Sequence, residues 1–269
     1  IESVVRATGT RTGLFTSPHL VRYGERIRVS GIEINEDEIA SHFTALRELV
    51  AEWEQRPTFF ELSLALAMKY FAERACELVI LETGMGGRLD ATTAVPADVA
   101  VLTPIALDHQ QWLGETLGEI AAEKASIIVP MKKVFSSPQL PEARTIIEQV
   151  ASERRAPLEF VEDPLHGYAL GLAGEHQHGN AALALAALHS VGITLSYETV
   201  KAGLGSTSWP GRFERLDSGP GAIASGLVLD IAHNPAAAAA LAANWVREFG
   251  ECKANLIFGV VESKDITGI

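Results

Sequence analysis

The sequence predicts an α/β protein built on a parallel sheet, and two observations carry that prediction. Short apolar runs typical of strands alternate with stretches typical of helices, which is the pattern of βαβ units. Residues 78–93, LVILETGMGGRLDATT, then place a carboxylate and a glycine-rich loop directly after one of these strands. Ligands of open α/β sheets bind at the carboxyl ends of strands, so this segment indicates a metal and substrate site. A solvated glutamate before a structural turn is the alternative interpretation.

The composition limits the classes of protein to which this chain can belong. The 269 residues suffice for one large domain or two ordinary ones, and 47% hydrophobic content with a mean hydropathy of +0.14 fills a substantial core. A net charge of −12 argues against a nucleic-acid or anionic-membrane partner. Cys76 and Cys252 lack the spacing of a disulfide framework or zinc site, so a cytoplasmic protein is expected. No apolar run or signal peptide indicates a membrane segment, and the first residue, Ile1, indicates an incomplete N-terminus.

Cap and turn signals predict the elements of the first hundred residues. Asn35 with Glu38 three residues later is typical of a helix start, and apolar residues at helical spacing continue to Trp53 before Pro57. The expected elements are a helix end over 1–9, a strand over 12–16, extended pieces over 26–30 and 32–34, helices over 35–53 and 61–72, and a buried strand over 78–81.

The same alternation continues to the end of the chain. The expected elements are strands over 99–103, 133–136, 227–229 and 254–260, and helices over 114–129, 142–153, 180–191 and 236–249. The stretch WPGR, residues 209–212, interrupts this pattern and is the best candidate for a linker. We therefore expect a parallel-sheet ATPase-type domain over 1–209 and the start of a smaller Rossmann-like α/β domain over 210–269.

Three side chains that suit a metal ion follow three successive predicted strands. Ser17 follows the first, Glu82 the second, and His109 lies in the loop after the third. A carboxylate, a hydroxyl and an imidazole make a loose shell that suits Mg²⁺ shared with a nucleotide phosphate. Each has an ordinary alternative: Ser17 as a turn or capping serine, Glu82 as a solvated strand end, and His109 as a loop histidine next to Asp108.

Lys124 lies within the apolar stretch AAEKASII. It is either a solvated lysine paired with Glu119 or Glu123, or a partly buried lysine among Ala121, Ala125 and Ile128. A buried lysine tends to lose its charge, and a neutral amine reacts with CO₂ to give a carbamate, an anionic oxygen ligand. Spacing alone does not decide between these alternatives.

A second polar group lies at the start of the last predicted helix. Asp230 follows a strand, with His233 and Asn234 close behind and Pro235 at the first helical turn. Such a helix start can position a phosphate or a carboxylate, and an ordinary capped helix is the alternative.

Eight segments, in the same order, resemble the folylpolyglutamate synthase/dihydrofolate synthase family of the Mur-ligase superfamily. They are GLFTSPHL (13–20), TFFE (58–61), ETGMGGRLDATT (82–93), LDHQQWLG (107–114), AAEKASII (121–128), GEHQHGNAALAL (174–185), WPGRFE (209–214) and LDIAHNP (229–235). The segments span nearly the whole chain, and several are long and specific.

The resemblance implies an ATP-dependent ligase that joins L-glutamate to a reduced folate through an acyl phosphate, with dihydrofolate synthesis as a second activity of the family. It implies Mg²⁺ at two sites, with Ser17, Glu82, His109 and a carbamylated Lys124 as ligands. Asn180, Arg212 and Asp230 would contact ATP, and His233 would lie near the γ-phosphate or the incoming glutamate; Lys124, Asp230 and His233 are the implied catalytic residues. The pterin site would be lined by Thr58, Phe59, Phe60, Glu61, Leu89, Asp90 and Ala91. The expected partners are small molecules, acting on a monomer.

The chain departs from the family pattern in several places. It contains no G-x-x-x-x-G-K-[ST] phosphate loop, residues 160–174 are shorter than the family's, the C-terminal domain is cut short, and Ile231 stands where glycine is usual. Two alternatives therefore stay open: a Mur-type ligase of peptidoglycan precursors, against which TSPHL and RLDATT argue, and a non-catalytic relic.

Overall fold

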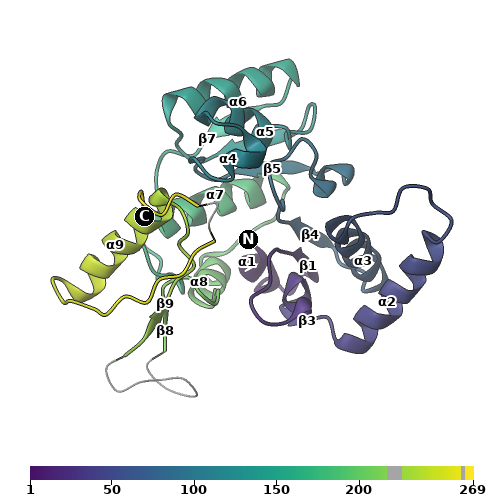
Figure 1. Ribbon diagram of the computed structural model, residues 1–269, viewed down its shortest axis with the longest axis horizontal. Coiled ribbons are helices and arrows are strands. Elements are labelled where there is room, and N and C mark those ends of the chain that lie inside the picture. Colours follow the sequence, from purple (N-terminus) through teal and green to yellow (C-terminus); the bar gives the residue numbers. More distant parts are fainter. Residues whose placement is uncertain (217–225, 262–263) are drawn as a thin grey trace. The chain divides into compact units, whose positions relative to one another are not determined.

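The computed structural model describes residues 1–216, 226–261 and 264–269. Their strands and helices form an α/β structure with parallel strand pairs, which confirms the predicted fold class (Figure 1). The chain groups into two compact units, one of Ile1–Asp98 with Leu188–Gly203 and one of Val99–Ala187 with Leu204–Ile269. The division into domains 1–209 and 210–269 stays a prediction.

The first unit contains a four-stranded sheet in the order β3-β2-β1-β4. Its strands are β1 (Thr12–Phe15), β2 (Ile27–Val29), β3 (Ile32–Glu33) and β4 (Leu78–Leu81). β1 runs parallel to β4 with Phe15 opposite Leu81, whereas β2 and β3 are antiparallel additions. The chain therefore leaves β1 and β4 at the same edge of the sheet. Every residue of β4 is half-buried, so the expectation of a buried strand there is wrong.

Capping boxes begin the two long helices of this unit. Asn35 accepts the amide of Glu38 to start α2 (Glu36–Leu49), as predicted, and Thr58 accepts the amide of Glu61 to start α3 (Phe59–Glu73). α2 ends four residues before Trp53, which is half exposed and packs too little to prolong the helix. The other helical pieces near the sheet are α1 (Glu2–Arg6), η1 (Tyr23–Arg26), η2 (Ala91–Ala94) and α8 (Tyr197–Gly205).

The second unit contains a three-stranded parallel sheet in the order β5-β6-β7. Its strands are β5 (Val99–Leu102), β6 (Lys133–Ser136) and β7 (Leu158–Phe160). β7 has only three residues, which are too few to show the alternation of apolar and polar side chains that predicts a strand. α5 (Leu117–Ala125) and α6 (Pro141–Glu153) pack together, and their buried Ile120 and Ile147 belong to one apolar core with Val134 of β6.

The helix expected over residues 114–129 is shorter than predicted, because it begins at Leu117 and ends at Ala125. α4 (Gln110–Leu113) ends at Gly114, whose φ of +123° no L side chain adopts without strain. Thr116 then caps α5 by accepting the amide of Glu119, while the carboxylate of Glu119 accepts the amides of Glu115 and Thr116. This local capping sets the start of α5 at Leu117 rather than at Gly114, and α5 ends at Ala125 rather than at Val129.

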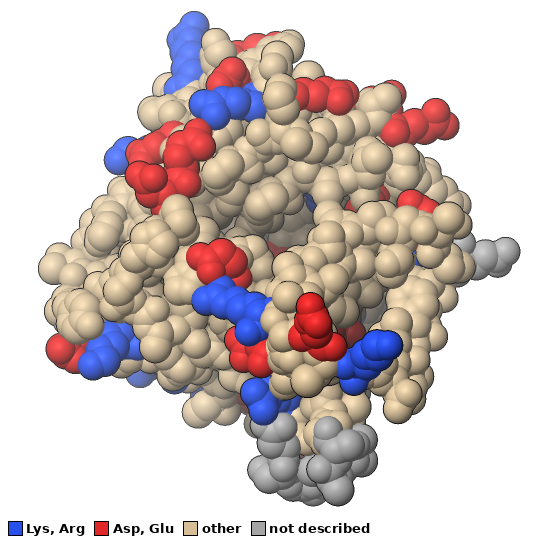
Figure 2. Space-filling view, turned by 90° about the vertical axis from the view of Figure 1, so that its left-hand side faces the viewer, with Lys and Arg blue, Asp and Glu red and all other residues tan. Residues whose placement is uncertain are grey.

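The last part of the chain contains α7 (His176–Ser190), β8 (Glu214–Arg215), β9 (Val228–Leu229) and α9 (Pro235–Phe249). β8 and β9 pair antiparallel. The strand expected over residues 254–260 does not form, because no described strand offers it hydrogen-bond partners; Leu256 and Ile257 are 80% and 98% exposed. No helix of the described chain has the length and apolar character needed to cross a membrane. On the face in Figure 2, acidic and basic side chains are interspersed.

Candidate active site

Ser17 and Glu82 meet at the edge where β1 and β4 end. The Ser17 amide donates a 2.8 Å hydrogen bond to Oε2 of Glu82, which connects the loop after β1 to the loop after β4. Glu82 is exposed and Ser17 is half-buried, so oxygen donors face solvent at this edge. Two of the predicted metal ligands thus lie together. His109 belongs to the second unit, and its convergence with them stays a prediction.

The glycine-rich loop after Glu82 is organised by Asp90. Its buried carboxylate accepts the amides of Gly84 and Met85 through Oδ2, and the amide and hydroxyl of Thr92 through Oδ1. Asp90 therefore holds the loop in shape. A Cβ on Gly84 would lie 2.6 Å from Phe60, so only glycine allows this close packing.

The residues predicted to line the pterin site fall into two groups. Phe59 and Leu89 are 56% and 82% exposed, whereas Phe60 packs on Phe15 with ring centroids 5.6 Å apart. Thr58 and Glu61 form the cap of α3, and the hydrogen bond from the Thr58 amide lowers the pKa of Glu61. Ala91 begins η2. The exposed members are therefore the ones open to a ligand.

Phe59 belongs to an aromatic cluster that sequence reasoning missed. Tyr23 stands edge-on to Phe59 at 5.8 Å, and the Arg26 guanidinium lies 5.5 Å from the Phe59 ring. Arg26 is itself buried and donates from Nε to Nδ1 of His19. Burial raises the pKa of Tyr23. Nothing in the local spacing signals this cluster, because its members come from the loop after β1 and from α3.

In the second unit, the side chains of Asp108, His109 and His233 lie close enough to share one ion. Oδ2 of Asp108 accepts a 2.9 Å hydrogen bond from Asn234 and lies 3.3 Å from Nε2 of His233. Oδ1 accepts a hydrogen bond from the Lys264 ammonium at 2.5 Å. Asp108 and Lys264 were not predicted as site residues, although Asp108 stands beside a predicted metal ligand.

Opposing effects set the pKa values of this cluster. Burial alone would raise the pKa of Asp108, but the hydrogen bonds from Lys264 and Asn234 hold it well below its ordinary value. Burial lowers the pKa of His109, against the opposing charge of Asp108. Burial also lowers the pKa of Lys124, again opposed by Asp108. Lys124 is half-buried within α5, which agrees with the prediction of partial burial.

The loops that carry Arg212 and Asp230 are tied together. The carboxylate of Asp230 accepts the amides of Phe213 and Ala232, each at 2.8 Å, and the Ile231 amide donates to the Gly211 carbonyl. Burial and then the charge of Arg212 lower the pKa of His176, while Asp230 opposes them. The charges of Arg212 and Asp230 therefore both act on one histidine. Asn180 donates to Gln177 on α7, and its place beside ATP stays a prediction.

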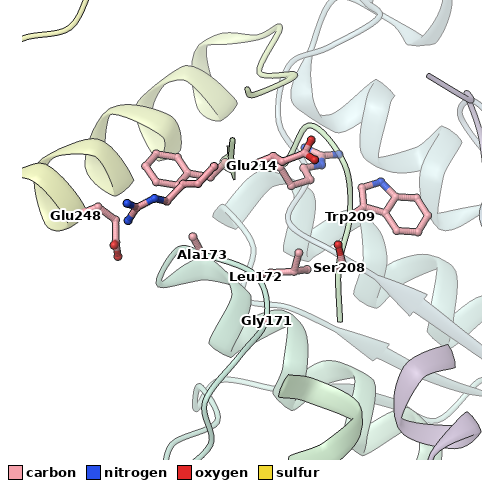
Figure 3. A pocket seen from close by; sticks show the side chains of 10 residues that line it. Gly171, Leu172, Ala173, Ser208, Trp209, Glu214 and Glu248 are labelled. Atoms are coloured by element: carbon pink, nitrogen blue, oxygen red, sulfur yellow. The ribbon is translucent and has the colours of Figure 1, made fainter. Parts of the chain in front are cut away.

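A pocket of about 290 Å³ lies next to these loops (Figure 3). Gly171, Leu172 and Ala173 line it from the segment before α7, and Glu248 reaches it from α9. Its remaining lining residues are Ser208, Trp209, Arg212, Phe213, Glu214 and Arg215. Arg212 is the one predicted ATP-contacting residue that lines it, whereas Asn180 and Asp230 do not.

Curated relatives match the chain over its length. It is 36% identical over 290 residues to the dihydrofolate synthase/folylpolyglutamate synthase of Escherichia coli, covering all of this chain and 65% of that protein. It is 32% identical over 296 residues to the enzyme of the same name from Bacillus subtilis, covering 98% of this chain and 68% of that protein. No protein-family model matches the chain.

Solved structures similar to this chain include an enzyme that carries the same two activity names as these relatives. E. coli FolC in complex with DHPP and ADP is 36% identical and superposes with a TM-score of 0.85, covering 99% of this chain and 66% of that one. A bifunctional folylpolyglutamate synthase/dihydrofolate synthase with Mn, AMPPNP and L-glutamate bound is 35% identical with a TM-score of 0.80, covering 91% and 62%. This chain thus spans about two thirds of the length of the proteins it matches, and it belongs to the folylpolyglutamate synthase/dihydrofolate synthase family of the Mur-ligase superfamily.

Proposed function

We propose that the protein is an ATP-dependent ligase that adds L-glutamate to reduced folates and their polyglutamates, with dihydrofolate synthesis as a second activity. The observation that carries the proposal is the Ser17–Glu82 contact at the ends of two parallel strands. It puts a carboxylate and a hydroxyl-bearing residue at the sheet edge where this class of fold binds ligands. The relatives with ADP, or with Mn, AMPPNP and L-glutamate bound, support the same substrates here.

The donor atoms of the proposed site suit a divalent cation. Glu82 offers an exposed carboxylate, and Ser17, Glu82 and His109 are proposed as Mg²⁺ ligands, with the carbamate of Lys124 holding a second Mg²⁺. Hard cations of this kind prefer oxygen ligands. When bound, Mg²⁺ neutralises the charge that builds on the transferring phosphate oxygens.

Lys124 is proposed to act as a carbamate. Burial lowers its pKa, which raises the fraction of neutral amine at a given pH. The neutral nitrogen forms a bond to the carbon of CO₂ and releases a proton, so that an ammonium-forming side chain becomes an anionic oxygen ligand. Its place in α5, between the buried Ala121 and Ala125, holds that ligand on a rigid element.

The remaining residues are assigned to the nucleotide and the amine. Arg212 and Asp230, which both act on His176, are proposed to contact ATP together with Asn180. His233 is proposed to lie near the γ-phosphate or the incoming glutamate. The exposed Phe59 and Leu89, with their neighbours in TFFE and LDA, are proposed to line the pterin site.

The proposed reaction has two steps, phosphorylation of the folate carboxylate and formation of the amide. A carboxylate oxygen of the folate bonds to the γ-phosphorus of ATP, the bond to ADP breaks, and an acyl phosphate forms. The amino nitrogen of L-glutamate bonds to the acyl carbon, inorganic phosphate leaves, and the nitrogen loses a proton to become an amide. Most of the rate enhancement comes from alignment and charge neutralisation.

The test is phosphate release by the full-length protein with tetrahydrofolate and L-glutamate together and with each alone. The proposal requires release that depends on both substrates, with a glutamylated folate as the product. Release without a folate, or none in a folded preparation, contradicts it. Replacing tetrahydrofolate with dihydropteroate tests the second activity separately.

We also propose that the protein acts as a cytoplasmic monomer. Cys76 and Cys252 are free thiols, which suits a reducing compartment. Light scattering of the full-length protein at micromolar concentration tests the monomer, and a mass of twice the chain contradicts it.

A further inference from the structure

We propose that Asp108 is a positioning residue that locks His233 and the start of α9 onto the loop carrying His109, with the Lys264 ammonium as its permanent counter-ion. The kinetic part of this inference rests on the proposed function. The structural part does not, because it concerns contacts within the second unit of this chain.

The carboxylate of Asp108 joins three separate segments of the chain. Oδ1 accepts the His109 amide at 2.8 Å and the Lys264 ammonium at 2.5 Å. Oδ2 accepts the Asn234 amide group at 2.9 Å and faces Nε2 of His233 at 3.3 Å. Asn234 and Lys264 are 126 and 156 residues away in the sequence, so this one side chain connects segments that are far apart along the chain.

The pair is sheltered from solvent. The side chains of Asp108 and Lys264 are only 18% and 12% exposed. Charge pairs open to water contribute little, whereas a partly buried, hydrogen-bonded pair is costly to break because one charge is left without a partner.

Lys264 also determines whether Asp108 binds a metal ion or forms an ion pair. Asp108, His109 and His233 by themselves have the spacing of a metal site. The ammonium on Oδ1 already supplies a positive charge to Asp108 and occupies the oxygen that a metal ion would use. Asp108 is therefore assigned to an internal ion pair, and His109 remains available as a ligand through its ring.

The contacts orient His233 from both sides. Its Nδ1 lies 2.9 Å from the carbonyl oxygen of Ile231, and its Nε2 faces Asp108. The next residue, Asn234, caps α9 by accepting the Ala237 amide at 2.8 Å while donating to Asp108. Loss of the Asp108 charge should therefore loosen the ring of His233 and the first turn of α9 together.

The experiment compares Asp108→Asn and Lys264→Met with wild type in the full-length protein. Asp163→Asn and Lys253→Met, at exposed positions, are the matched controls. Lys264→Arg is the conservative variant that should restore the pair. Hydrogen–deuterium exchange is read at the amides of residues 232–240, with α6 as the internal reference, and kcat and KM are measured for glutamate ligation.

We expect exchange over residues 232–240 to rise at least about tenfold in both test variants, with α6 unchanged. We expect kcat to fall about tenfold or more while KM for ATP stays within about twofold, and Lys264→Arg to recover most of the loss. A purely structural role would instead raise exchange throughout the second unit.

Any other outcome of these measurements refutes a specific part of the proposal. Unchanged exchange over 232–240 in both variants refutes the lock. Faster exchange with unchanged kcat refutes positioning for the reaction. Absence of ligation in the wild type refutes the proposed function, and exchange alone then decides the lock. Because Lys264→Met leaves Asp108 in place, failure of Asp108→Asn to fold does not remove the test.

Discussion

The backbone amide of Ser17 donates a 2.8 Å hydrogen bond to Oε2 of Glu82, joining the ends of two parallel strands that are 65 residues apart in the sequence. Glu82→Gln keeps the shape of the side chain and an acceptor oxygen for this bond, but removes the charge proposed to hold Mg²⁺. We expect phosphate release to fall at least about 100-fold with an unchanged thermal midpoint. Glu54→Gln, at an exposed position, is the control, and normal turnover of Glu82→Gln refutes the metal assignment.

Asp90 is expected to be a stability residue of the glycine-rich loop. Asp90→Ala leaves the amides of Gly84 and Met85 and both donors of Thr92 without their acceptor. Because these groups are buried or partly buried, the free energy of unfolding should fall by about 2–4 kcal/mol. Urea denaturation measures it, with the exposed Asp163→Ala as control. A loss below about 0.5 kcal/mol would show that water replaces the carboxylate.

Gly84 is expected to be intolerant of any side chain. The Cβ of Gly84→Ala would lie 2.6 Å from the Phe60 ring and 3.2 Å from Oδ2 of Asp90. Overpacking should cost about 1–3 kcal/mol of unfolding free energy. The double variant with Phe60→Leu should recover part of that cost, which a double-mutant cycle detects.

Gly179→Ala is the matched control for this substitution. Gly179 lies inside α7, and apart from its chain neighbours and the backbone of its own helix no described atom stands within 4 Å of its added Cβ. The alanine should therefore stabilise the protein by about 0.5–1 kcal/mol. Equal effects of the two substitutions would show that the contact with Phe60 is unimportant.

Glu25 gives the loop after Ser17 a pH-dependent stability. Its carboxylate accepts the amides of Arg22, Leu20 and Val21, and these bonds, that from Arg22 first, lower its pKa from 4.5 to about 2. A depressed pKa means that the stabilisation is complete above pH 4.5 and is lost as the pH falls towards 2. Because the carboxylate is open to solvent, we expect only about 1 kcal/mol at pH 7.

Glu25→Gln tests this dependence. Its unfolding free energy should lie below that of the wild type at pH 7, and the difference should shrink as the pH falls below 4.5. A difference that stays constant with pH would mean that packing, and not the charge of Glu25, accounts for the loss.

Lys124 should make turnover depend on dissolved CO₂. Removing CO₂ from the buffer should lower ligation several-fold, and added bicarbonate should restore it. Lys124→Arg should be inactive with or without bicarbonate, because a guanidinium stays protonated and forms no carbamate. Lys253→Arg serves as the control. Full activity of Lys124→Arg would exclude the carbamate.

The periodic elements were predictable because their signals are local. The cap at Asn35, the apolar run of β6 and the proline at the start of α9 each act within a few residues. Local signals also misled: the helix predicted to begin at Gly114 begins only at Leu117, because Gly114 has a positive φ and the capping box of Thr116 sets the start. The apolar residues 254–260 have strand composition, but a strand exists only where a partner accepts its hydrogen bonds.

The sequence by itself determined the fold class, the family and the positions of Ser17 and Glu82 directly after two strands, because these depend on residue order alone. The parallel pairing that brings the two strand ends together was decided by the tertiary structure. Only the tertiary structure showed that Lys264 reaches Asp108. The physical reason is distance along the chain. A contact across 156 residues leaves no local pattern, since it arises when packing brings a buried charge to the partner that stabilises it.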